Sequence, residues 1–154
     1  MWLNYEMEKI KYNSEDIVSH HGIAAIIENE EGEILMQEHT KYGFWTIPIG
    51  KVAKGQSVED GLKQELFEEC NIVIEDYTEV VTRNYMYERD GNEVLVISHL
   101  FDILKYSGDV NNNEPEKHIQ QVYISVEKIK DLPYLSDLTL LFLETLGIKR
   151  EARI

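Results

Sequence analysis

The stretch that most constrains this fold runs from Gly50 to Ile72 and reads GKVAKGQSVEDGLKQELFEECNI. A glycine- and lysine-containing loop leads into Ser57, a residue type that commonly caps helix N-termini. The apolar residues that follow recur at every fourth position: Val58, Leu62, Leu66 and Cys70. This spacing predicts a helix with one apolar face. At about 100° per residue, Glu65 and Glu69 fall within or beside that apolar face, and Glu68 lies on its edge.

Carboxylates at these positions are costly for three reasons. Glu65 faces Glu68 and Glu69 at helical spacing, and each like-charge pair destabilises a helix by roughly 0.2–0.5 kcal/mol. Glu68 and Glu69 also lie in the last turn, where the helix dipole favours cations. A carboxylate removed from water needs a partner. A divalent cation such as Mg²⁺ or Mn²⁺ would relieve all three costs. The alternative is a solvated, glutamate-rich face of an acidic protein.

The same stretch resembles the Nudix box, G-x5-E-x7-R-E-U-x-E-E-x-G-U, where U is a bulky aliphatic residue. Gly50 takes the first position, Glu65-Leu66-Phe67-Glu68-Glu69 matches the E-U-x-E-E core, and Ile72 closes the box. Three residues differ from the box at its Glu, Arg and second Gly positions: Gln56, Gln64 and Asn71. Asn is the next best residue to Gly in the left-handed conformation after a helix. Gln64 can hydrogen-bond Glu68 at i, i+4 but carries no charge.

The resemblance, which points to the MutT-like subset, implies an α/β (α+β) fold, the Nudix α/β/α sandwich with a mixed central sheet. It also implies a metal-dependent hydrolase of nucleoside diphosphate-linked substrates, with a nucleoside triphosphate giving the monophosphate and pyrophosphate. Glu65, Glu68 and Glu69 would hold Mg²⁺ or Mn²⁺, and Glu68 or Glu65 would be the catalytic base. In the family the box arginine helps to orient the glutamates. We therefore expect slow or metal-demanding turnover, and a faster enzyme from Gln64→Arg.

The two departures at Gln56 and Gln64 also leave a different class of protein open. A Nudix-fold binding module would hold a nucleotide or sugar-nucleotide without hydrolysing it. The intact set of three clustered glutamates argues against a pure binding role.

Five residues outside the helix are further candidates for the site. Gly50 and Lys51 follow an aromatic lead-in like that of the family, and Lys51 is the natural phosphate partner in this loop, with a plain solvated lysine as the alternative. The segment 114–117, which reads Glu-Pro-Glu-Lys, resembles an element from which a glutamate can complete the metal site, and Glu116 is the candidate here. A solvated turn fixed by proline is the alternative. His39 could approach the substrate and Arg83 could reach phosphate, although an arginine in a hairpin is commonly a surface residue.

The rest of the chain predicts two hairpins and a closing helix. Apolar residues from Ile17 to Ile27 and from Ile34 to Met36 flank a polar turn. A second hairpin is predicted for 80–87 and 93–104 around Asp-Gly-Asn at 90–92. A final helix is expected from Ser136 to Gly147. We expect a single domain over 1–154, with the resemblance covering about 17–147 and residues 1–16 forming an N-terminal extension.

Composition narrows the partners and the compartment. The 154 residues carry a net charge of −14, which argues against a nucleic-acid polymer or an anionic membrane as partner. The expected partner is a small-molecule nucleotide, and a homodimer stays open. Cys70 is the single cysteine, so no internal disulfide forms, and this suits a reducing cytoplasm. The N-terminus lacks an apolar signal-peptide core, and no apolar run approaches the length of a membrane span. We therefore expect a cytoplasmic protein.

Overall fold

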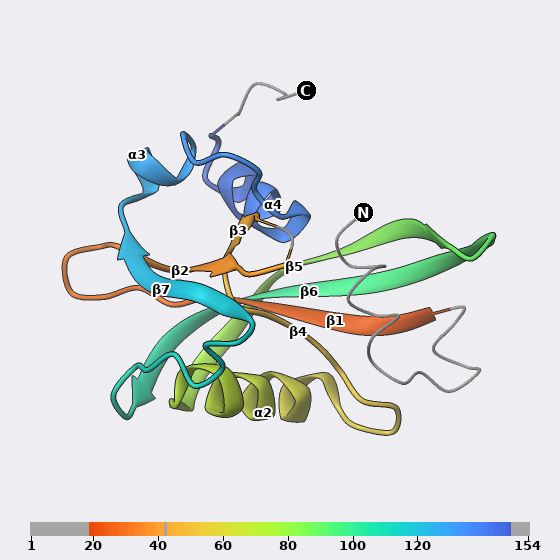
Figure 1. Ribbon diagram of the computed structural model, residues 1–154. Coiled ribbons are helices and arrows are strands. Elements are labelled where there is room, and N and C mark those ends of the chain that lie inside the picture. The colour runs from red at the N-terminus through yellow and green to blue at the C-terminus, as the bar shows by residue number, and fades with distance from the viewer. Residues whose placement is uncertain (1–18, 42, 149–154) are drawn as a thin grey trace.

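A four-stranded mixed sheet forms the centre of the protein in this computed structural model, which describes residues 19–41 and 43–148. Its strands are β1 (Ser19–Ile26), β4 (Ile49–Lys51), β5 (Val73–Arg89) and β6 (Asn92–Ser107), in the order β4-β1-β6-β5. β1 pairs with β6 in parallel, and the other neighbours are antiparallel. The mixed central sheet expected from the sequence is confirmed (Figure 1). The predicted extension at 1–16 lies outside the described residues.

The β5–β6 hairpin is longer than the sequence pattern predicts. Its turn falls at Asp90 and Gly91, which have φ values of 50° and 78°. Both are positive, as tight hairpin turns that match the strand twist require, and Gly adopts such values without strain. The two strands then stay paired from Arg89↔Asn92 to Val73↔Ser107, and β5 accommodates register shifts near its start.

The first predicted hairpin is only partly formed. The turn exists, since Glu28 bridges Ile34 and the backbone N–H of Leu35 donates to the Ile27 carbonyl. However, β2 (Ile34–His39) leaves β1 and joins a separate three-stranded sheet with β3 (Trp45–Thr46) and β7 (His118–Ile124), in the order β3-β2-β7. Alternation of apolar residues shows that two segments are strands, but it does not decide which strands pair.

Helix α2 (Val58–Cys70) begins and ends where the sequence predicts. The Ser57 hydroxyl accepts a hydrogen bond from the Asp60 N–H at 3.0 Å and so caps the first turn. Asn71 ends the helix in the left-handed conformation, with φ 64°. The predicted capping roles of both residues are confirmed.

Helices cover both faces of the four-stranded sheet (Figure 1). On one face α2 packs through Leu62 and Leu66 against apolar side chains of β1 and β6. On the other face lie α3 (Val126–Ile129) and α4 (Asp137–Thr145), and α4 is capped by the Ser136 hydroxyl. This is the predicted three-layer arrangement. In the described part of the chain, no helix is long and apolar enough to cross a membrane.

Candidate active site

Two carboxyl groups of α2, those of Glu65 and Glu69, form a pair in which Glu69 is buried and Glu65 half-buried. They lie one helical turn apart on the face that meets the sheet edge, and Glu69 is only 6% exposed. Burial raises the pKa of Glu69 well above its ordinary value, and the neighbouring charge of Glu65 raises it further. Burial also raises the pKa of Glu65, whereas the hydrogen bond that the two carboxyl groups share lowers it. As the sequence predicts, carboxyl groups lie within or beside the apolar face of α2.

The backbone of β4 lies directly against this pair at Gly50. A Cβ atom at Gly50 would fall 2.5 Å from Cγ and 2.7 Å from Oε2 of Glu65, distances that no side chain can occupy. Gly50 is opposite Ile23 in the sheet and therefore points to the face that α2 covers. The glycine is needed at this position because it lets a strand and a carboxylate approach closely.

Glu68 is exposed, and its charge raises the pKa of Glu65. Its Oε1 accepts a hydrogen bond from Nε2 of Gln64 at 2.8 Å, as the i, i+4 spacing predicts. Gln64 in turn accepts from Nε2 of Gln56 at 2.5 Å, a contact that the sequence reasoning missed. Two of the three residues that depart from the Nudix box, Gln56 and Gln64, thus belong to one series of hydrogen bonds that ends on Glu68.

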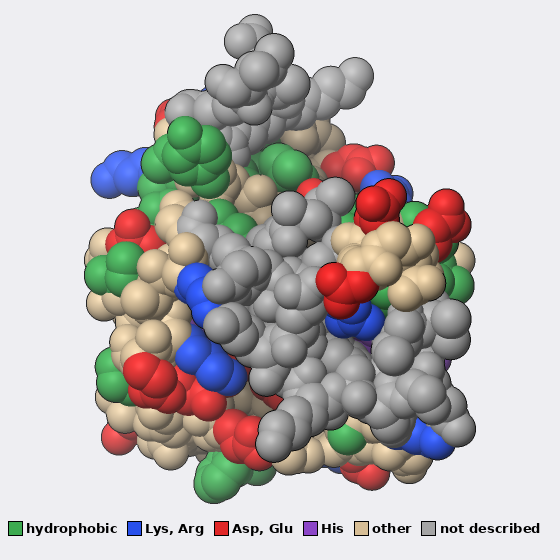
Figure 2. All heavy atoms as spheres, turned by 45° about the vertical axis from the view of Figure 1, so that its right-hand side comes forward, with side chains coloured by type: hydrophobic (Ala, Val, Ile, Leu, Met, Phe, Trp, Pro, Cys, Tyr) green, Lys and Arg blue, Asp and Glu red, His purple; other side chains and the backbone are tan. Residues whose placement is uncertain are grey.

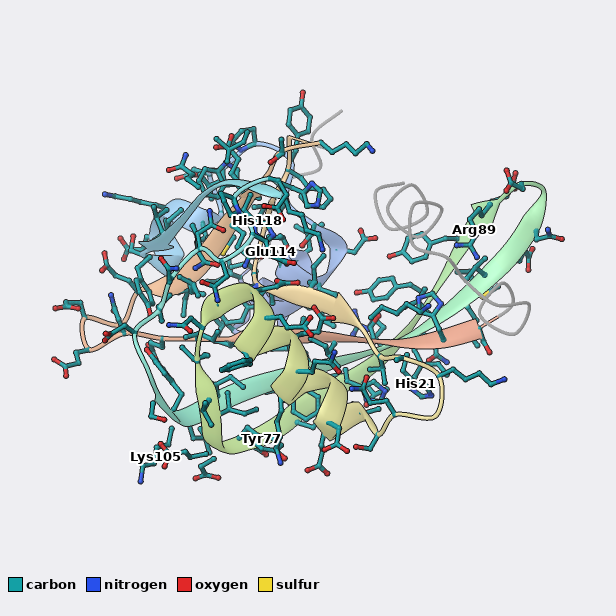
Figure 3. All side chains as sticks on the ribbon, turned by 60° about the horizontal axis from the view of Figure 1, so that its bottom comes forward. His21, Tyr77, Arg89, Lys105, Glu114 and His118 are labelled. Atoms are coloured by element: carbon teal, nitrogen blue, oxygen red, sulfur yellow. The ribbon has the colours of Figure 1, made fainter. Side chains whose placement is uncertain are left out.

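The segment 111–117 docks on the C-terminal end of α2. The backbone N–H groups of Asn111 and Asn113 donate to the carbonyls of Cys70 and Glu69, at 3.0 and 3.1 Å. This docking brings Glu114 close to the pair, so that its charge raises the pKa of both Glu65 and Glu69. Figure 3 shows Glu114 beside His118 next to α2.

Glu114 is the carboxylate of this segment that acts on the pair, and the sequence reasoning did not select it. Its carboxylate also lies 3.6 Å from Nζ of Lys117, whose charge lowers the pKa of Glu65 and Glu69. Glu116, the residue chosen from the sequence, is exposed. The Glu-Pro-Glu-Lys element offers one glutamate on each side of the proline, and only the docking of the segment distinguishes them.

The remaining predicted site residues lie apart from the two buried carboxyl groups. Lys51 is opposite Gly22, so its side chain points to the sheet face away from α2. Arg83 on β5 makes two hydrogen bonds to Glu144 of α4, at 2.7 and 3.4 Å. His39 is buried at the end of β2, where its ring packs edge-on against Phe44 and His118.

The donor chemistry of the buried pair fits a hard divalent cation. Two carboxyl groups are gathered against a backbone that a Cβ would fill, and burial together with the charge of Glu65 opposes ionisation of Glu69. A cation bound between them would replace the shared proton. Among residues 19–41 and 43–148, no three His, Cys, Asp or Glu groups already form a metal-ligand set.

Burial, rather than the number of acidic residues, distinguishes this pair. Figure 2 shows acidic side chains spread over the surface that it displays. Such solvated carboxylates repel one another weakly, because water screens them. Glu69 is buried and Glu65 half-buried, so water screens their charges less, and a cation would be attracted most strongly to their position.

Comparison with known proteins identifies the family to which this chain is similar. The model described as "NUDIX domain" matches residues 18–140. A MutT NUDIX hydrolase from Burkholderia pseudomallei has 24% identity and a TM-score of 0.67, over 82% of this chain and 96% of that chain. The MutT protein from Methanosarcina mazei Go1 has 26% identity and a TM-score of 0.65, over 84% and 94%.

A third solved structure is the NUDIX domain of Shewanella oneidensis NrtR, complexed with ADP ribose. It has 11% identity and a TM-score of 0.68, over 93% of this chain and 96% of that chain, and so it supports the fold alone. The search of curated proteins found no match.

Proposed function

Because this chain belongs to the NUDIX family of hydrolases, which act on nucleoside diphosphate derivatives, we propose that it hydrolyses a nucleoside triphosphate to the monophosphate and pyrophosphate with Mg²⁺ or Mn²⁺. The buried carboxyl pair of Glu65 and Glu69 against Gly50 carries this proposal. A protein that only needed a stable helix would gain by replacing these two residues with apolar ones, since burying unpaired carboxylates is unfavourable.

In the proposed reaction each residue near the pair has a distinct task. Glu65 and Glu69 hold the cation, and Glu68 and Glu114 are placed to complete its ligands. When bound, the cation neutralises phosphate charge and lowers the pKa of a water molecule. Glu68 or Glu65 accepts the proton of the attacking water. Glu116 stays a sequence prediction for the same metal site.

Substrate contacts are proposed for residues around β4. Gly50 lies against the carboxylates, and Lys51 would neutralise phosphate charge from the other side of the edge strand. His39 and Arg83 stay predictions for substrate binding. For Arg83 this requires release from Glu144, with which it forms an ion pair at 2.7 Å. We further propose that the protein works in the cytoplasm on small nucleotides, with a homodimer as the assembly to test.

The decisive experiment compares the natural protein with Glu69→Gln on a panel of nucleoside triphosphates, nucleoside diphosphate sugars and ADP-ribose. We expect turnover that requires Mg²⁺ or Mn²⁺ and falls by at least about 100-fold in the variant, the lower end of the effect of a catalytic group. Glu127→Gln, which removes the same charge from exposed α3, is the control and should retain full activity. Absence of turnover across the panel would refute the hydrolase and, if nucleotide binding persists, favour a binding module.

The same variant should stabilise the metal-free protein. The pKa of Glu69 is raised on folding, so the folded state binds more protons above the ordinary value and its stability falls as pH rises from there. Glu69→Gln removes this loss. We expect a higher Tm at pH 7.5 without metal, by about 2–4 °C for each kcal/mol relieved, and no gain at pH 4. An unchanged Tm at both pH values would show that the buried carboxyl costs nothing.

A further inference from the structure

Three hydrogen bonds link the loop before α2 to Glu68. The backbone N–H of Ala53 donates to Oε1 of Gln56 at 3.0 Å. Nε2 of Gln56 donates to Oε1 of Gln64 at 2.5 Å, and Nε2 of Gln64 donates to Oε1 of Glu68 at 2.8 Å. Each amide therefore accepts one hydrogen bond and donates the next.

The groups at the two ends of this series of hydrogen bonds, Ala53 and Glu68, fix the orientation of both amides. A backbone N–H can only donate, so Gln56 must present its carbonyl oxygen to Ala53. An ionised carboxylate can only accept, so Gln64 must present its NH₂ group to Glu68. The remaining NH₂ of Gln56 and the remaining oxygen of Gln64 then face each other as donor and acceptor. No other orientation satisfies all three contacts.

The helix surface beneath the loop is shaped to admit Gln56. A Cβ atom at Gly61 would lie 3.3 Å from Oε1 of Gln56 and 3.0 Å from a methyl group of Val52. Gly61, Gln64 and Glu68 occur at helical spacing on one face of α2, next to the face of Glu65 and Glu69. The loop can therefore lie flat on this face, with its amide over the glycine.

We propose that Gln56 and Gln64 are a matched pair of positioning residues, which ties Glu68 to the loop before α2 and sets where its carboxylate meets the metal site. The proposal rests on the proposed function through the role of Glu68. The departures at Gln56 and Gln64 are then one compensated change, because two neutral amides together replace the Glu–Arg pair of the Nudix box.

The pairing predicts that restoring only one of the two charged residues of the Nudix box, at position 56 or at position 64, disrupts the hydrogen bonds. Gln64→Arg puts a guanidinium, which has donors but no acceptor, against the NH₂ of Gln56. Gln56→Glu puts a carboxylate against the oxygen of Gln64. Rotating the neighbouring amide would repair either contact only by breaking the one to Ala53 or to Glu68. With both changes present, the new carboxylate accepts from Ala53 and from the new guanidinium, which also donates to Glu68. The proposed pairing thus predicts the opposite of the expectation that Gln64→Arg alone speeds the enzyme.

A double-mutant cycle tests the pair in the full-length protein with Gln56→Glu, Gln64→Arg and both together. The first readout is the Mn²⁺ concentration that gives half of the maximal thermal shift, and the second is kcat/KM with its pH profile. We expect each single change to raise the Mn²⁺ midpoint about 10-fold, the middle of the range for contacting residues, and the double variant to return within about threefold of the natural value. The acidic limb of the pH profile should move and return in the same way.

Controls separate positioning from folding and from the hydrolase proposal. Gln64→Met keeps the side-chain length without either hydrogen bond, and it should raise the Mn²⁺ midpoint while the metal-free Tm changes little. Gln120→Met removes an equally exposed amide that donates to Glu38 at 2.9 Å on another strand, and it should change neither readout. Single variants with the natural Mn²⁺ midpoint, or a double variant as weak as the product of the two singles, would overturn the pair. If the natural protein hydrolyses nothing, the hydrolase proposal fails, and the Mn²⁺ titration still decides the pair.

Discussion

His118 shows how a single residue responds to the packing of the segment before it. It is buried at the start of β7, and its Nδ1 has no hydrogen-bond partner among the described residues. Burial, together with the nearby charges of His39 and Lys117, lowers the pKa of His118 from 6.5 to about 4. The side chain is therefore neutral in the folded protein at pH 7.

The pKa of His118 predicts a loss of stability in mild acid. The unfolded chain binds a proton near pH 6.5 and the folded protein only near pH 4, so the free energy of unfolding falls as pH drops through this window. We expect His118→Gln to remove about 2 kcal/mol of the loss between pH 7.5 and 5, at 1.36 kcal/mol per pKa unit. Urea unfolding at the two pH values measures this. Equal pH dependence in both proteins would contradict the assignment.

At the scale of elements, local rules predicted the helix caps. They did not predict which strands pair or where loops dock, because those depend on tertiary structure. Ser57 and Asn71 could be recognised because a cap depends on one residue and its nearest backbone groups. The assignment of β2 to a second sheet could not, because alternation is the same whichever strand is the neighbour. The Gln56–Gln64 contact and the choice of Glu114 over Glu116 depend on where loops dock. No spacing along the chain encodes that docking.

The contact of β4 with α2 predicts a defined effect of Gly50→Ala. The new Cβ would lie 2.5 Å from Glu65, so the strand or the helix must shift. We expect a loss of about 1–3 kcal/mol, typical of overpacking, together with a weaker thermal shift by Mn²⁺. Gly22→Ala on the next strand is the control, because its Cβ would meet nothing closer than 3.4 Å. An unaltered response to Mn²⁺ in Gly50→Ala would remove Gly50 from the proposed site.

The two larger apolar clusters of the described residues lie on opposite faces of the central sheet, and Glu65 and Glu69 lie beside only one of them. Leu62 of α2 and Leu141 of α4 are both fully buried, at 0% and 2% exposure. Truncating either to alanine should cost about 2–5 kcal/mol in urea unfolding. Only Leu62→Ala should also weaken the response to Mn²⁺, since it loosens the helix that holds Glu65 and Glu69. Equal effects on Mn²⁺ binding would mean that the two layers act as one unit.

The parallel pairing of β1 with β6 also governs how this fold is reached. β1 is an inner strand of the sheet, yet its parallel neighbour follows only after α2 and β5 in the chain. During synthesis the central β1–β6 pair thus cannot form until β6, which is made much later, is available. The β5–β6 hairpin, in contrast, closes locally through its own turn. Long-range pairing of this kind pays loop-closure entropy before it gains contacts, which slows folding. The nascent chain must keep the apolar strand β1 from pairing wrongly until β6 has left the ribosome.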